Sequence, residues 1–226
     1  IHAIARIVVA KDPLLASHKA DWAVHQVGGG LWHDRLNFAW VDAFNDSVWI
    51  YAGQLAAEAV HTGFNEVQFD YVRFPDEPRS RMAQAIFPAR RAGESVRSGV
   101  ARNLKLLRDR IKPLSVPFTI DVFGMTTNVT VDLGIGQVWE DLITSADVVL
   151  PMVYPSHYYQ AMYGASHPNS EPYRVVRGAL ADGQRRSRHS GSRGPPPVHA
   201  PPRAGRPHAI PAPSCAPQCR ARPCRA

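Results

Sequence analysis

The chain has 226 residues and a formal net charge of +7, and this charge is unevenly distributed. Residues 1–183 contain all 19 acidic residues and are close to neutral, whereas residues 184–226 contain nine arginines and no acidic residue. The basic balance therefore belongs to the end of the chain and does not indicate that the folded part binds nucleic acid. No apolar run reaches the ~18 residues of a membrane span, and residues 1–183 have no cysteine for a disulfide or a metal site.

Alternating strand and helix patterns run through residues 1–183. A strand is expected over residues 4–10, followed by a long irregular stretch and a helix that Asn45 or Asp46 caps and Gly63 ends. The later elements are expected as a strand over residues 66–75, a helix over 96–111, a strand over 117–123, a short helix over 137–146, a strand over 147–154 and a helix that opens with Pro172. This order predicts an α/β fold with a parallel sheet.

The connections between these elements are long on only one side of the predicted sheet. Each strand is joined to the next helix by a long loop, and each helix to the next strand by a few residues. Long loops at the carboxyl ends of parallel strands are typical of a TIM (β/α)8 barrel, which needs ~250 residues and eight strands. We therefore expect residues 1–183 to be the middle of such a barrel, with about four βα units and without the strands before residue 1 and after residue 180. A doubly wound sheet is the alternative, but no Gly-x-Gly-x-x-Gly motif follows a strand, and no cofactor is expected.

Residues 184–226 are expected to be disordered. Proline, arginine, alanine and glycine make up 29 of these 43 residues, and such a composition cannot bury enough apolar surface to fold. The codons of these four amino acids begin with two G or C bases and the change at residue 184 is abrupt, so we interpret the segment as an out-of-frame translation of GC-rich DNA. A natural arginine- and proline-rich tail that binds nucleic acid is the alternative.

Two carboxylates are predicted at the carboxyl ends of neighbouring strands. Gln68 and Asp70 share one face of their strand, and Thr119 and Asp121 share one face of the next. Because neighbouring strands lie ~4.8 Å apart, Asp70 and Asp121 fall within the ~5–9.5 Å separation of glycosidase carboxylate pairs. Close carboxylates push their pKa values apart, which provides one acid and one base or nucleophile. The alternatives are a structural ion pair for Asp70 and a capping or loop-bracing role for Asp121.

Other polar and aromatic residues are predicted around this pair. Arg6 or Arg73 could hold the ionised carboxylate, and His157 could donate a hydrogen bond to a substrate. His157 has no metal-ligand spacing with His2 or His167, so no metal site is expected. The aromatic side chains that could stack on sugar rings, or simply pack the long loops, are Trp22, Trp32, Trp40, Tyr71, Phe74, Tyr154, Tyr158, Tyr159 and Tyr163.

Five ordered blocks resemble the bacterial DUF4015 family, which is named as a glycoside hydrolase domain. They are residues 5–13 (ARIVVAKDP), 63–75 (GFNEVQFDYVRFP), 121–124 (DVFG), 134–137 (GIGQ) and 151–158 (PMVYPSHY). The resemblance covers roughly residues 1–182 and implies a TIM barrel, with these strands as its third to sixth, and an envelope or secreted location. The residues that we expect to contact a carbohydrate substrate are Arg6, Lys11, Asp12, Gln68, Tyr71, Arg73, Tyr154, His157 and Tyr158.

Three hypotheses about function follow. The first is a glycoside hydrolase acting on a polysaccharide or cell-envelope glycan, with Asp70 as nucleophile or base and Asp121 as its acid/base partner. The second is a non-catalytic barrel that binds carbohydrate or cell wall. The third is a metal-dependent hydrolase or deacetylase that uses His157 and aspartates as ligands. Because four strands cannot close a barrel, we expect this chain alone to be inactive and to associate through its open edges.

Overall fold

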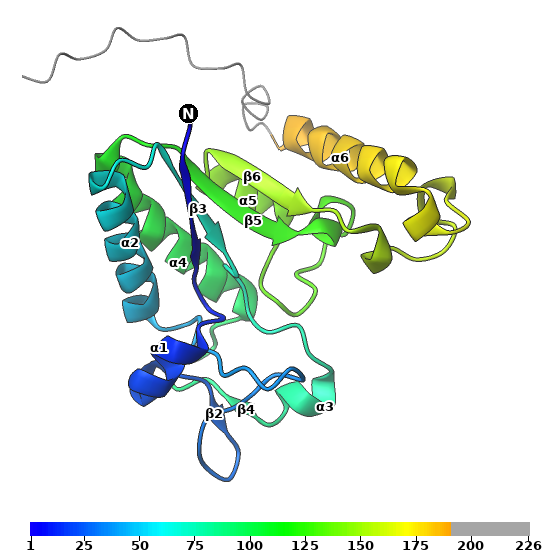
Figure 1. Ribbon diagram of the computed structural model, residues 1–226. Helices are drawn as coiled ribbons and strands as arrows, with labels where there is room; N and C mark the ends of the chain where they lie inside the picture. The colour runs from blue at the N-terminus through cyan, green and yellow to red at the C-terminus, as the bar shows by residue number, and fades with distance from the viewer. Residues whose placement is uncertain (191–226) are drawn as a thin grey trace, which may run out of the picture. The chain divides into compact units, whose positions relative to one another are not determined.

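A parallel sheet of four strands organises residues 1–190, the part of the chain that the computed structural model describes (Figure 1). The strands are β1 (Ile4–Val8), β3 (Glu66–Asp70), β5 (Phe118–Phe123) and β6 (Val148–Met152), and they lie in this order across the sheet. Each strand is thus added on the same side as the chain proceeds. The predicted α/β fold with a parallel sheet is confirmed, although every strand is shorter than expected.

One face of the sheet packs against helices. Residues alternate in direction along a strand, and those on this face are fully buried: Val67, Phe69, Phe118, Ile120 and Val122. They share one hydrophobic core with side chains of α2 (Asp46–His61), α4 (Val96–Ile111) and α5 (Trp139–Ser145). Helix α2 lies against β1 and β3, and α4 lies beside both α2 and α5, so the three helices cover the same face (Figure 1).

The opposite face of the sheet carries polar side chains. Arg6 of β1 stands opposite Gln68 of β3, and Gln68 stands opposite Thr119 of β5. Asp70 and Asp121 follow two residues later on the same face, as strand parity predicted. The carboxyl ends of three neighbouring strands therefore bring together a guanidinium, an amide and two carboxylates.

Sequence signals at the helix starts account for the positions of α2 and α4. The Asn45 side chain accepts a hydrogen bond from the Ser47 N–H (2.9 Å), and Ser95 and Ser98 form a reciprocal capping box. The first N–H groups of a helix have no partner within the helix, so these side chains satisfy them. The amide of Asn103, which is fully buried on α4, donates to the Ala43 carbonyl (2.9 Å) and fixes α4 to the segment before α2.

Two excursions of the chain extend beyond the carboxyl ends of β1 and β3 (Figure 1). The first contains α1 (Pro13–His18) and β2 (His25–Gln26), and the second contains α3 (Arg79–Met82) and β4 (Ala85–Ile86). Strands β2 and β4 pair antiparallel and thereby join the two excursions. Trp32 and Phe44 are fully buried in this part of the core. The long loops that the sequence predicted are thus packed structures next to the polar strand ends.

Helix α6 (Pro172–His189) begins at Pro172 as predicted but extends into the segment that was expected to be irregular. The Trp139 indole N–H on α5 donates to the Gly183 carbonyl (3.1 Å) and to the buried Ser187 hydroxyl (3.2 Å). Arg186 donates to the Glu140 carboxylate at 2.5 and 2.7 Å. The prediction of irregular structure is therefore wrong for residues 184–189, and an out-of-frame segment beginning at residue 184 does not account for these contacts. The rest of that prediction falls on residues 191–226, outside the described residues.

Candidate active site

Arg6 lies between two carboxylates at the carboxyl end of the sheet. Its Nη2 atom contacts Asp70 Oδ2, and its Nε atom lies 3.7 Å from Asp121 Oδ2. Both aspartates are almost fully buried, whereas the Arg6 side chain is 53% exposed. One guanidinium therefore reduces the repulsion between Asp70 and Asp121, and the two predicted carboxylates belong to one cluster.

Asp121 differs from Asp70 in its partners. The Gln68 Nε2 atom donates to both carboxylate oxygens of Asp121, each at 2.8 Å. Burial raises the pKa of Asp121 above its ordinary value and the neighbouring Asp70 carboxylate raises it as well, while Gln68 and Arg6 act in the opposite direction. Asp121 is thus the carboxyl group of the pair that keeps a proton more readily than usual, and Asp70 is the one in direct contact with Arg6.

The backbone at Tyr71 ends β3 and orients Asp70. Tyr71 has φ +53°, in the left-handed region, so the strand stops at Asp70 instead of continuing to Pro75 as predicted. In this conformation the Tyr71 N–H donates to Asp70 Oδ1 (2.6 Å). A non-glycine residue in the left-handed region costs ~1–2 kcal/mol, and such residues are concentrated at functional sites. Asp70 is therefore held on one side by Arg6 and on the other by its own backbone.

A cleft of about 640 Å³ opens beside Asp70. Asp121 and Gln68 do not line it, so of the two predicted carboxylates only Asp70 faces the cleft directly. The residues that line the cleft are Arg6, Lys11, Asp34, Arg35, Leu36, Trp40, Asp70, Tyr71, Arg73, Asp76, Glu77, Phe123, Met125, Leu133, Met152, Tyr154, His157 and Tyr159.

Lys11 lies in the cleft within an aromatic cage. Its Nζ atom is 4.8 Å from the ring centroid of Phe38 and 5.6 Å from those of Trp40 and Tyr71. The same atom pairs with Asp34 Oδ2 at 2.9 Å, and the Trp40 indole N–H also donates to that oxygen (3.0 Å). Asp34 is buried, yet its pKa lies below the ordinary value because hydrogen bonds from Phe38, Lys11 and Trp40 outweigh desolvation. Lys11 was predicted from the sequence but Asp34 was not, because the role of Asp34 depends on the fold of the first excursion.

Three exposed side chains, Tyr154, His157 and Tyr159, line the cleft on the β6 side. His157 stacks on Phe123 at 5.3 Å between ring centroids, and Tyr154 meets His157 edge-on at 5.3 Å. Tyr154 and Tyr159 are 54% and 72% exposed. These rings line the same cleft as Trp40 and Tyr71.

Besides Gln68, two residues that were predicted to contact substrate do not line the cleft. The Asp12 carboxylate caps α1 by accepting the Leu15 N–H (2.8 Å), and Asp12 does not line the cleft. Tyr158 is buried in a separate hydrophobic cluster with Val175 and Ala179 of α6, and its burial raises the pKa of its hydroxyl to about 12. The short helical turn at Pro155–His157 carries the chain round, so that Tyr158 points into this cluster and Tyr159 toward the cleft.

The predicted aromatic set also divides between cleft and core. Trp32 and Phe74 are fully buried, and Trp22 packs against the main core. Tyr163 packs with Tyr158 below α6, and its hydroxyl donates to Asp182 (2.7 Å). The members of the set that reach the cleft are Trp40, Tyr71, Tyr154 and Tyr159.

A third buried carboxylate lies on the polar face, at the other end of β3. Glu66 accepts a hydrogen bond from the Thr119 hydroxyl (2.6 Å), and its other oxygen lies 2.8 Å from His2 Nε2. Glu66 was read from the sequence only as the start of the strand. Its period-2 relation to Gln68 and Asp70 is the signal that could have placed it on this face.

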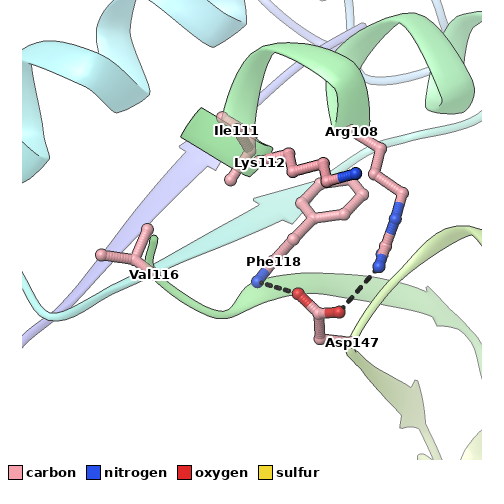
Figure 2. Close-up of a pocket in the computed structure, with 6 residues that line it drawn as sticks. All are labelled: Arg108, Ile111, Lys112, Val116, Phe118 and Asp147. Carbon is pink, nitrogen blue, oxygen red and sulfur yellow. Dashed lines mark hydrogen bonds and ion pairs between the residues drawn. The ribbon is translucent and has the colours of Figure 1, made fainter. Parts of the chain in front are cut away.

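A smaller cavity of about 210 Å³ lies at the amino ends of β5 and β6, away from the cleft (Figure 2). Asp147 accepts hydrogen bonds there from the Phe118 N–H (3.0 Å) and from Arg108 Nη2 (2.9 Å). Arg108 also donates to the Ser145 carbonyl (3.0 Å). These contacts fasten the end of α4 to the starts of two strands.

Within residues 1–190, no three histidine, cysteine, aspartate or glutamate side chains are grouped closely enough to hold a metal ion. The helices of this part of the chain also include none that is both long and apolar enough to cross a membrane.

Comparison with known proteins places this arrangement in a family. A family model described as "Putative glycosyl hydrolase domain" (DUF4015) matches residues 1–200. The chain belongs to the DUF4015 family. This confirms the resemblance that the five sequence blocks indicated.

This DUF4015 chain is similar to a solved structure of a hypothetical protein from Ruminiclostridium thermocellum, with 38% sequence identity and a TM-score of 0.43. The match covers 49% of this chain and 54% of that one, so the DUF4015 chain spans about half the length of the solved chain. Comparison with curated proteins found no match.

Proposed function

We propose that this DUF4015 chain is part of a glycoside hydrolase that cleaves a polysaccharide or cell-envelope glycan. The observation that carries the proposal is the Asp70–Arg6–Asp121 cluster beside the cleft. Two carboxyl groups in different environments are what glycoside hydrolysis requires, because one must stay ionised and the other must deliver a proton. The family description points in the same direction.

The sheet supports a barrel rather than a doubly wound fold. The strands follow one another across the sheet in chain order, and α2, α4 and α5 cover a single face. A doubly wound sheet reverses its order at a switch point and carries helices on both faces. We therefore propose that the four strands are an arc of a TIM barrel whose inner face carries Arg6, Gln68, Asp70 and Asp121.

In the proposed reaction Asp70 is the nucleophile or base, and Asp121 is the acid/base partner. Asp70 lines the cleft and is paired with Arg6. Asp121 lies behind this pair with a raised pKa, so it is suited to donate a proton. Delivery to a glycosidic oxygen requires the half-exposed Arg6 side chain to shift when a glycan binds. A polymeric substrate of this kind places the proposed activity outside the cell or in its envelope.

A non-catalytic carbohydrate-binding barrel is the second candidate, and the exposed rings of Tyr154 and Tyr159 in the cleft favour it. It shares the cleft and differs in chemistry, because binding needs the aromatic rings but no proton donor. Both candidates predict that glycan binding decreases when Tyr154 is replaced by alanine.

Hydrolysis and binding are therefore measured on the same samples. The purified chain and a longer natural protein that carries this cleft are incubated with a panel of labelled polysaccharides and cell-wall fragments, products are detected by mass spectrometry, and bound glycan is measured by affinity electrophoresis. We expect product from the longer protein, and Asp70→Asn in that protein should abolish product formation while binding is retained. The matched control is Asp109→Asn on the exposed side of α4, which should change neither quantity.

The result also separates the two candidates. The binding module is favoured if Asp70→Asn leaves binding intact and neither the unmodified chain nor a longer natural protein that carries this cleft forms product. If neither the chain nor the longer protein binds a glycan or forms product, both the hydrolase and the binding module are overturned.

A further inference from the structure

Arg73 lines the cleft three residues after Asp70 and has few partners for a guanidinium. It stacks over Tyr71 at 4.9 Å and over Trp40 at 5.6 Å from the ring centroids. Its Nη1 atom donates to the Phe74 carbonyl (3.0 Å), and its Nε atom is buried with no hydrogen-bond acceptor among the described residues. A guanidinium has five N–H donors, so Arg73 retains donors that the protein itself does not use.

The other cations of the cleft are each paired with a carboxylate. Arg6 contacts Asp70, Lys11 contacts Asp34 at 2.9 Å and Arg35 lies 3.9 Å from Glu77. In contrast, no carboxylate of residues 1–190 lies within 4.0 Å of Arg73 (its nearest acidic influences, Asp76 and Asp70, act from farther away). Arg73 is therefore the cleft cation in this part of the chain that lacks an ion pair.

A buried cation without an ion pair or hydrogen-bond acceptors destabilises the folded protein. Burial lowers the pKa of Arg73 below that of an ordinary arginine, which reflects the cost of keeping its charge away from water. Stacking on Tyr71 and Trp40 offsets part of that cost and fixes the plane of the guanidinium. A planar, fixed guanidinium with free donors matches the two oxygens of an oxyanion.

We propose that Arg73 forms an anion-binding subsite next to Asp70 and that the glycan bound in the cleft is acidic, carrying a carboxylate or sulfate group on a sugar ring. This inference rests on the proposed function only in taking a glycan as the ligand. The anionic group would lie against Arg73, and Asp76, which is exposed in the same cleft, would oppose it.

The test compares charged oligosaccharides with uncharged forms of the same chain. The full chain is titrated by calorimetry with galacturonic-acid oligomers and their methyl esters, and with sulfated carrageenan oligomers and their desulfated forms. We expect tighter binding of the charged member of one pair, and the pair that responds distinguishes carboxylate from sulfate. Arg73→Gln should weaken that binding roughly 10- to 100-fold, the range of a hydrogen-bonded charge, and leave the uncharged member unchanged.

Two further variants keep the result interpretable if Arg73→Gln folds poorly. Arg73→Lys keeps the charge but loses the paired N–H donors of the guanidinium. Its affinity for the charged oligomer should lie between those of the unmodified chain and Arg73→Gln. Asp76→Asn should strengthen binding of the charged oligomer. Arg79→Gln, which removes the same charge from an exposed position outside the cleft, is the control and should have no effect.

Equal affinity for charged and uncharged members, equal weakening of both by Arg73→Gln, or no binding to either charged oligomer would overturn the anion subsite. These outcomes are independent of hydrolysis. If binding of the charged oligomer depends on Arg73 but no glycan is cleaved, the hydrolase is refuted and the anion subsite is retained. If only neutral glycans are cleaved, the hydrolase is retained and the anion subsite is refuted.

Discussion

Arg6 stands opposite Gln68 in the register of β1 and β3, yet its guanidinium contacts Asp70, two residues farther along the face. This diagonal contact leaves the Gln68 amide free to turn to the neighbouring strand, where it donates to both oxygens of Asp121. The two contacts connect three strands at their carboxyl ends. They also give the two aspartates different partners, which is the basis of their proposed division of roles.

The first prediction concerns Arg6→Gln. Arg6 is one of the groups that lower the pKa of Asp121 against the effect of burial, so its removal should raise that pKa further. Loss of the contact with Asp70 should also reduce the free energy of unfolding by about 1–3 kcal/mol. Carboxyl ¹³C NMR titration and urea denaturation measure the two effects. Arg97→Gln, which breaks an exposed ion pair with Asp141, is the control, and an unchanged Asp121 titration in Arg6→Gln would contradict the prediction.

The second prediction concerns pH and Asp42, a buried aspartate that accepts hydrogen bonds from the Phe44 and Ala89 N–H groups, each at 2.8 Å. Burial raises its pKa to about 6, against ~3.9 in an unfolded chain. Between these values the folded state binds more protons, so the contribution of Asp42 to stability falls as pH rises. The loss should total ~3 kcal/mol between pH 4 and 6.

Urea denaturation between pH 4 and 7 measures this effect. The free energy of unfolding of the unmodified chain should fall more steeply with pH than that of Asp42→Asn, because the amide does not titrate. Asp34 and Glu94, whose pKa values are lowered, lose their contributions as pH falls, so they cannot produce a decrease with rising pH. Parallel curves for the two proteins would show that folding does not raise the pKa of Asp42.

The sequence predicted the directions of the site's side chains within the strands but not in all of the loops that follow them. Within strands, side chains alternate by geometry alone, so the common face of Gln68, Asp70 and Asp121 could be predicted from parity. Beyond the strand ends this rule fails. Asp12 turned out to cap a helix, and the turn before Tyr158 directs that ring into the core, because loop backbone angles depend on tertiary contacts that no local pattern encodes.

Residues 184–189 were placed outside the fold for a related reason. Composition describes how much apolar surface a segment can bury, and by this measure residues 184–189 looked unable to fold. Their contacts with α5 are instead specific and polar, and they come from Arg186 and Ser187. Asp34 was missed in the same way, since its pairing with Lys11 depends on the path of the first excursion.

The third prediction tests this end of α6. The Arg186 guanidinium, besides pairing with Glu140, donates to the Thr126 and Val129 carbonyls at 2.7 and 2.6 Å, and its side chain is 18% exposed. Arg186→Ala should lower the free energy of unfolding by about 2–3 kcal/mol, because it leaves a carboxylate and two carbonyls without this donor. Arg188→Ala, an exposed neighbour on the same helix, should change it by less than about 0.5 kcal/mol. Both variants are measured by thermal and urea denaturation. An equally small loss of stability in Arg186→Ala and Arg188→Ala would mean that α6 does not depend on Arg186.

The last prediction concerns the edges of the sheet. Within residues 1–190, β1 pairs only with β3 and β6 only with β5, so each leaves one row of backbone N–H and C=O groups open. Apolar side chains accompany these rows, since Ile4 is 39% and Leu150 is 40% exposed. Open apolar edge strands pair with further strands, and a charged side chain on the edge opposes such pairing.

We therefore expect the chain to self-associate with rising concentration in sedimentation velocity, and Leu150→Lys to shift it toward the monomer. Val131→Lys makes the same substitution at a 63% exposed position outside the strands and is the matched control. It should leave association unchanged, because it adds the same charge without touching an edge. A monomer at all concentrations, or equal effects of the two variants, would show that the edges do not mediate association.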